Sequence, residues 1–74
     1  MKVTLDRKSN SVYIYLSDNI RPGDVANTYP CDPAEVGGTI NLDFDVSGRL
    51  IGIEVLDATS KLPDEIINSA IKFD

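Results

Sequence analysis

The feature that most constrains the fold of this chain is an alternation of apolar and polar residues with a period of two. It runs through four segments rich in β-branched or aromatic residues: 2–6, 11–17, 39–45 and 50–56. Successive side chains of a strand point to opposite faces of a sheet, so this period is typical of strands with one apolar face. Because a short turn separates each successive pair, the four segments predict two β-hairpins in one antiparallel sheet.

The first two segments predict a hairpin around the polar stretch 6–10. Pairing Leu5 with Val12 and Val3 with Ile14 keeps the apolar side chains on one face. This requirement fixes the register, because a slip of one residue would turn every side chain of a strand to the other face.

The turn of the second hairpin has two interpretations. Gly48 suits a three-residue loop with a bulge, because glycine readily adopts a positive φ. The apolar pattern instead places Asp45 opposite Leu50 across a four-residue loop, 46–49. The pattern favours the longer loop, because a slip would move the isoleucines of the last segment onto the face of the aspartates.

The middle of the chain, residues 22–38, is the part that the pattern describes least. The stretch 25–29 is a candidate third strand, which Pro30 and Pro33 confine to an edge or an irregular crossing because proline has no N–H to donate. The stretch 34–38 is predicted as a loop.

Residues 62–73 predict a helix, because Pro63 suits its first turn and apolar residues recur at helical spacing toward the sheet. The chain is therefore predicted to be a single domain over residues 1–74 of class α+β. Its fold is predicted as a small antiparallel β-meander of four to five strands, with one C-terminal helix packed on one face.

Composition narrows the ways in which such a small domain gains stability. A core of 74 residues supplies little stability alone, and small folds often add disulfides, a metal or a second subunit. The single cysteine, Cys31, excludes a disulfide within the chain, and the lack of histidine excludes the usual zinc and copper sites in a monomer. The sequence therefore predicts no cofactor and predicts self-association, most simply a homodimer.

The charge balance and the terminal segments also predict where the protein works and what it avoids. A net charge of −5 disfavours binding to nucleic acid and to anionic membranes. No apolar run approaches the roughly 18 residues of a membrane span, and the first residues lead directly into a strand rather than a signal peptide. A lone thiol then fits a reducing compartment, so we expect the cytoplasm.

Three carboxylates form the first candidate site. Asp43, Asp45 and Glu54 are predicted to share one sheet face. Clustered oxygens can hold a hard cation such as Mg²⁺ or Ca²⁺, and paired carboxylates can act as acid and base. The alternative is a solvated sheet face with Asp45 beginning the turn. This alternative is favoured, so we predict no catalytic residue and lean against an enzyme.

Two tyrosines form the second candidate site. Tyr13 and Tyr15 share a face opposite the predicted helix, and that face is predicted to be a subunit interface with three further members: Leu50, Gly52 and Leu56. The alternative is that the middle segment folds over this face. Because Gly52 lies inside a strand, we also predict that Tyr13 or Tyr15, from this chain or a second copy, lies over it.

The two ends of the chain carry a family resemblance. The runs "VTLDRKSNSVYIYLSD" and "LDFDVSGRLIGIEVLDATSKLP" resemble the YuzE-like family of small bacterial proteins, a domain of unknown function numbered 2283. The matching positions are Asp6, Val12, Tyr13, Ile14, Asp43, Asp45, Gly48, Gly52, Ile53 and Glu54. The resemblance implies a small β-meander with a C-terminal helix and transfers no reaction. Some members of that family resemble antitoxins that pair with small toxin-like proteins.

We therefore expect a small soluble protein that acts as a non-catalytic binding or structural module in a homodimer. Two alternatives remain open. One is an antitoxin-like partner of a small basic toxin, and the other is a hard-metal-dependent enzyme that uses the acidic sheet face.

Overall fold

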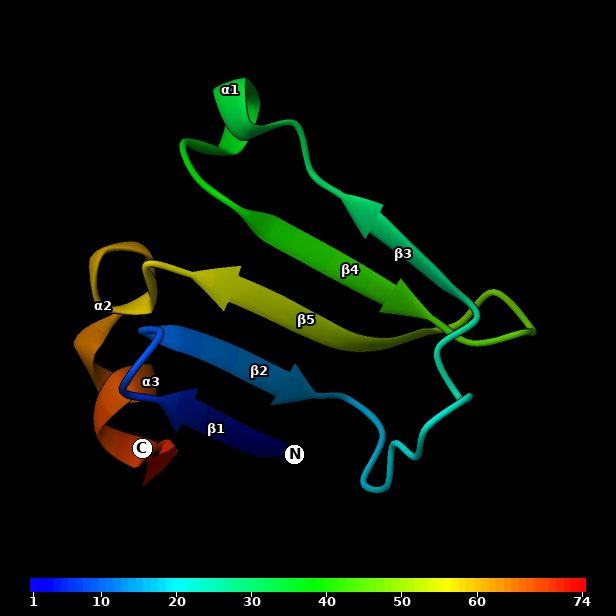
Figure 1. The fold of residues 1–74 in the computed structure, drawn as a ribbon, viewed down its shortest axis with the longest axis horizontal. Coiled ribbons are helices and arrows are strands. Elements are labelled where there is room, and N and C mark those ends of the chain that lie inside the picture. Colours follow the sequence, from blue (N-terminus) through cyan, green and yellow to red (C-terminus); the bar gives the residue numbers. More distant parts are fainter.

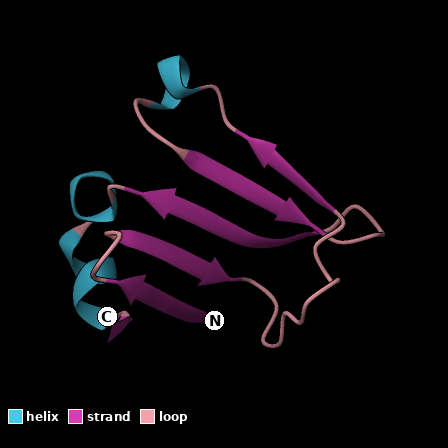
Figure 2. Cartoon of the chain, in the orientation of Figure 1, coloured by secondary structure: helices cyan, strands magenta, loops and turns pink.

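A computed structural model describes residues 1–74 and shows one six-stranded sheet with the strand order β3-β4-β5-β2-β1-β6 (Figure 1). The strands are β1 Lys2–Asp6, β2 Ser11–Tyr15, β3 Asn27–Pro30, β4 Ile40–Phe44, β5 Leu50–Leu56 and β6 Ile71–Phe73. The helices are α1 Pro33–Val36, α2 Ala58–Lys61 and α3 Asp64–Ser69 (Figure 2). The predicted α+β class is confirmed. The sheet is mixed rather than antiparallel, because β6 runs parallel to β1.

The first hairpin has the predicted register. Leu5 lies opposite Val12, and Val3 lies opposite Ile14. β2 then pairs with β5, so that the two predicted hairpins join into one sheet. The candidate third strand is also present, as β3 at the edge of the sheet beside β4.

The second hairpin combines both interpretations of its turn. Next to the turn, Asp45 N–H donates to the Arg49 carbonyl oxygen (2.9 Å) and Gly48 has a φ of 81°, as in a three-residue loop. The predicted four-residue loop is therefore wrong. Farther along, a bulge shifts the register, so that Asp43 faces Gly52 as the apolar pattern requires.

The predicted C-terminal helix over 62–73 is wrong in its second half. The helix α3 ends at Ser69, and Ala70 takes an extended conformation (φ −68°, ψ 147°). The chain then adds β6 to the edge of β1, where Arg7 N–H donates to the Phe73 carbonyl oxygen (2.8 Å). Pairing β1 satisfies backbone groups that a longer helix would have left open at the sheet edge.

The stretch 34–38 is also more ordered than the predicted loop. Asp32 accepts a hydrogen bond from Ala34 N–H (3.0 Å) and caps α1, and Gly37 ends this single turn in the left-handed region (φ 69°). The turn 57–61 likewise contains α2. The sheet therefore carries three short helices rather than one.

The helices cover only one end of the sheet. α2 and α3 gather beside the ends of β5 and β1, far from the turn between β4 and β5 (Figure 1). Here Ala58 and Ala70 pack with Leu5 and Val12 in the core cluster. Only two other apolar residues are buried, Ile51 and Val55, so the apolar face is incompletely covered. None of the helices has the length and apolar character that crossing a membrane requires.

Candidate functional site

One face of the sheet, here called the polar face, holds most of the predicted site residues. Cross-strand partners in the antiparallel ladders share a face. The register therefore gathers the following residues on it: Lys2, Thr4, Tyr13, Tyr15, Thr28, Asn41, Asp43, Gly52 and Glu54.

The centre of the polar face is a chain of hydrogen bonds across three strands. Tyr13 Oη donates to Asp43 Oδ2 (2.6 Å), and Thr28 Oγ1 donates to Asp43 Oδ1 (2.7 Å). One step along the strands, Asn41 Nδ2 donates to Glu54 Oε1 (2.9 Å). Both carboxylates thus accept hydrogen bonds from their own chain, which ties β2 and β3 to the central strands.

The environment of Tyr13 favours its neutral form. Partial burial is the largest cause and raises the pKa of the phenol well above its usual value near 10. The hydrogen bond to Asp43 and the negative charge of that carboxylate raise this pKa further. Tyr13 therefore serves as a hydrogen-bond donor to Asp43 and remains protonated at neutral pH.

Gly52 provides the space that the Tyr13 ring occupies. A Cβ atom at position 52 would overlap the hydroxyl end of the Tyr13 ring, Oη and Cζ. The prediction that Tyr13 or Tyr15 lies over Gly52 is confirmed, with Tyr13 of the same chain in that place. Tyr15 packs edge-on against Tyr13 with ring centroids 4.7 Å apart, and Lys2 Nζ lies 4.4 Å from the Tyr15 ring centroid.

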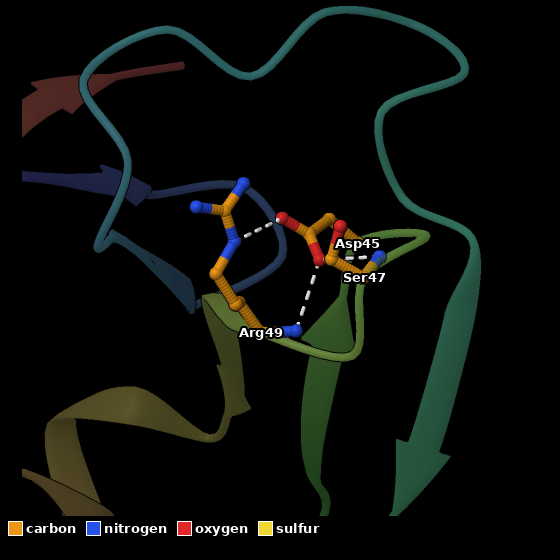
Figure 3. A network of polar contacts seen from close by, with 3 residues as sticks. All are labelled: Asp45, Ser47 and Arg49. Atoms are coloured by element: carbon orange, nitrogen blue, oxygen red, sulfur yellow. Dashed lines mark hydrogen bonds and ion pairs between the residues drawn. The ribbon is translucent and has the colours of Figure 1, made fainter.

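Asp45 belongs to the turn and not to the polar face. Its carboxylate accepts hydrogen bonds from Ser47 N–H (2.9 Å), Arg49 N–H (2.9 Å) and Arg49 Nε (3.0 Å), as Figure 3 shows. The hydrogen bond from the Arg49 backbone is the main cause that lowers the pKa of Asp45, and the Arg49 side chain adds to it. Asp45 therefore holds the turn, the role that the alternative interpretation gave it.

The predicted carboxylate cluster is consequently divided. Asp43 and Glu54 are on the polar face with separate partners, whereas Asp45 binds Arg49 in the turn. No group of three His, Cys, Asp or Glu side chains is arranged to hold a metal ion. The bulge explains the difference, because it breaks the simple alternation that was expected to carry Asp45 onto the same face.

The five predicted interface residues are also placed differently from one another. Tyr13, Tyr15 and Gly52 are together on the polar face, while Leu56 at the end of β5 is 37% exposed. The bulge pairs Leu50 with Phe44, so Leu50 departs from the alternation that had grouped it with Gly52. That these residues form a subunit interface remains a prediction, but the space above Gly52 needs no second copy to fill it.

An open groove lies beside the turn. It has a volume of about 310 Å³, and the lining comes from the loop after β2 and from the turn: Ser17, Ile20, Gly23, Asp24, Asp45, Val46, Arg49 and Ile51. Its charged groups pair with one another nearby, since Arg49 binds Asp45 and Arg21 N–H donates to Asp24 (2.8 Å). Cys31, the only thiol, is half-buried at the other end of β3.

Sequence reasoning missed a feature on the opposite, apolar face. The register aligns five apolar residues in a straight line across five strands, here called the open row: Tyr29, Leu42, Ile53, Ile14 and Val3. None of them is buried, and Tyr29 is 61% exposed. The alternation of each strand was visible in the sequence, but the pairing of β3 with β4 was not.

The comparison with protein families places the chain. A family model described as "Protein of unknown function (DUF2283)" matches residues 2–58. The chain belongs to this family. The match spans the sheet from β1 through β5 and ends at the first residue of α2, so α3 and β6 lie outside it. No curated protein matches the chain. No solved structure matches it either.

Proposed function

We propose that the protein is a non-catalytic binding or structural module that works as a homodimer. The observation that carries this proposal is the incomplete cover of the apolar face. Only six apolar residues are buried in the single chain, whereas the apolar face crosses five strands. An apolar sheet face normally packs against another layer, and α2 and α3 supply that layer at one end only.

The dimensions of the chain support a missing layer. Its accessible surface is 4911 Å², against about 4,500 Å² for a compact monomer of its mass. Its radius of gyration is 12.2 Å, against about 11 Å for a compact domain of this length. The molecule measures 32 × 29 × 19 Å and is therefore a thin slab. A second copy would give the slab a second layer.

The polar face supports a structural role over a catalytic one. Asp43 and Glu54 accept hydrogen bonds from side chains of neighbouring strands, and these contacts explain their presence. Asp45, the third candidate, accounts for the shape of its turn. The three residues with potential for metal or acid–base chemistry thus each stabilise the fold.

Sedimentation equilibrium of the purified chain at micromolar concentrations tests the homodimer. We expect twice the mass of one chain, with dissociation on dilution. A single-chain mass at every concentration would contradict the proposal.

A second candidate is an antitoxin-like partner of a small basic protein, which the net charge of −5 favours through electrostatic complementarity. We propose the cytoplasm as the place of either function, because a lone thiol such as Cys31 remains reduced there. Capture of a small basic protein by the tagged chain, weakened by added salt, would support this candidate. The absence of a basic protein among the captured partners would count against it.

A further inference from the structure

We infer that the open row is the contact surface between two copies of this chain. The inference rests on the proposed homodimer and says which face forms it. It differs from the prediction drawn from the sequence, which placed the interface on the face of Tyr13 and Tyr15.

The register makes the open row a continuous apolar surface. Tyr29 faces Leu42, Leu42 faces Ile53, Ile53 faces Ile14, and Ile14 faces Val3. Neighbouring strands are about 4.8 Å apart, so the row extends for roughly 19 Å between its end strands. A second row runs parallel to it, with Ile40, Val55, Val12 and Leu5, and this second row leads to the helices. The open row is thus the uncovered part of one apolar face.

The two faces of the sheet differ in what they leave unsatisfied. On the polar face, side chains of the same chain already fill the space above Gly52 and bind both carboxylates. On the apolar face, Ile14 and Val3 touch the core cluster only at its border, and Tyr29 extends into solvent. Burial of apolar area is the main driving force of association, so the apolar face gains more from a partner.

The distribution of charge favours a second copy as that partner. Two chains of net charge −5 repel each other unless the surfaces that meet are uncharged. Among β1 to β5, every charged strand residue falls on the polar side of the alternation: Lys2, Asp6, Asp43 and Glu54. Two copies of the open row therefore meet without opposing carboxylates.

The size of the face also suits a dimer. Its outline of 32 × 29 Å is roughly 900 Å², and about 600–1,000 Å² per partner is usual for a specific interface. The end under α2 and α3 is occupied, so the second copy sits toward the turn between β4 and β5 (Figure 1). Ile53 is in the middle strand of the row, so a two-fold axis through the middle brings Ile53 beside its own copy.

Matched charge substitutions on the two faces test the inference. Tyr29→Glu and Leu42→Glu place carboxylates in the open row, and Tyr29→Glu changes a residue already 61% exposed in the monomer. Leu56→Glu makes the same change on the end of β5, 37% exposed, and serves as the control. Circular dichroism verifies that each variant is folded, and sedimentation equilibrium gives its mass.

We expect folded monomers for both row variants, with dissociation constants raised at least 100-fold, and a wild-type dimer for Leu56→Glu. If the row variants remain dimers and Leu56→Glu dissociates, the interface is elsewhere and the inference is wrong, although the homodimer stands. If Leu42→Glu does not fold, Tyr29→Glu decides alone. A wild-type chain that is monomeric, or that pairs only with a different protein, overturns both the inference and the homodimer.

Discussion

Tyr13 and Gly52 act as one unit on the polar face. Gly52 leaves room for the Tyr13 ring, and the ring in turn delivers its hydroxyl to Asp43. A glycine inside a strand costs about 0.5–1 kcal/mol relative to alanine. The chain offsets this cost with a buried aromatic ring and a charge-assisted hydrogen bond.

This coupling predicts the effect of filling the space above Gly52. Gly52→Ala should displace Tyr13 from Asp43 and lower the free energy of unfolding by about 1–2 kcal/mol, because a hydrogen bond to a charged group is lost. In a Tyr13→Ala background the same substitution should raise it by about 0.5–1 kcal/mol, because only the strand preference of alanine remains. Urea unfolding of the four chains measures the cycle. An equal effect in both backgrounds would show that the two residues are independent.

The raised pKa of Tyr13 predicts a loss of stability in alkali. The unfolded phenol ionises near pH 10, whereas the folded phenol stays protonated to higher pH. The contribution of Tyr13 is therefore complete below pH 10 and decreases as the pH rises above it. Urea unfolding between pH 8 and 11 should show a steeper decline for the wild type than for Tyr13→Phe. Parallel declines would mean that Tyr13 ionises alike in both states.

At the scale of elements, Asp45 predicts how the turn between β4 and β5 responds to acid. Its pKa is lowered in the folded state by hydrogen bonds from Arg49 and Ser47. The stabilisation is therefore present above pH 4 and is lost as the pH falls through the pKa of the folded state. Asp45→Asn retains a turn-forming side chain without the charge, so the wild type should be more stable at pH 7 and nearly equal at pH 2. A difference that persists in acid would point to geometry instead of charge.

The C-terminal strand makes a second prediction at this scale. Deleting residues 71–74 removes β6 and turns β1 into an edge strand. Hydrogen exchange should then become faster at Arg7 and in β1, while β4 and β5 keep their protection. Asp74→Asn, which removes only the exposed contact of Asp74 with Arg7, is the control and should change little. Unchanged protection of Arg7 and β1 after the deletion would contradict the pairing.

The elements also show what the sequence can predict. The register of Leu5 with Val12 follows from alternation alone, because only one pairing keeps the apolar residues together. Ile71 and Phe73 fit helical spacing as well as a strand, and the open edge of β1 that decides between them exists only in the folded sheet. The turn was ambiguous because a bulge satisfies both the glycine and the apolar pattern.

For the candidate sites, the same limit separates local from distant information. The contact at Gly52 was predictable, because a glycine inside a strand requires a reason and tyrosines lie on the paired strand. Asp45 was misplaced because the bulge at the turn cannot be read from alternation. The open row was missed because it needs the position of β3, which a connection of irregular residues hides.

For the whole molecule, the central question is how a thin slab of 74 residues obtains a sufficient core. α2 and α3 cover one end of the apolar face, and the open row remains along its middle. If a second copy covers that row, folding and assembly are linked, and the chain gains stability with concentration. The polar face then remains outside the dimer, stabilised by its own hydrogen bonds.

Intermolecular nuclear Overhauser contacts in a dimer of one isotope-labelled and one unlabelled chain test this account most directly. We predict contacts between copies at the methyl groups of Ile14, Leu42 and Ile53, and none at Leu56. Contacts that instead connect Leu56 and Tyr15 of the two copies would place the interface on the polar face and contradict the account.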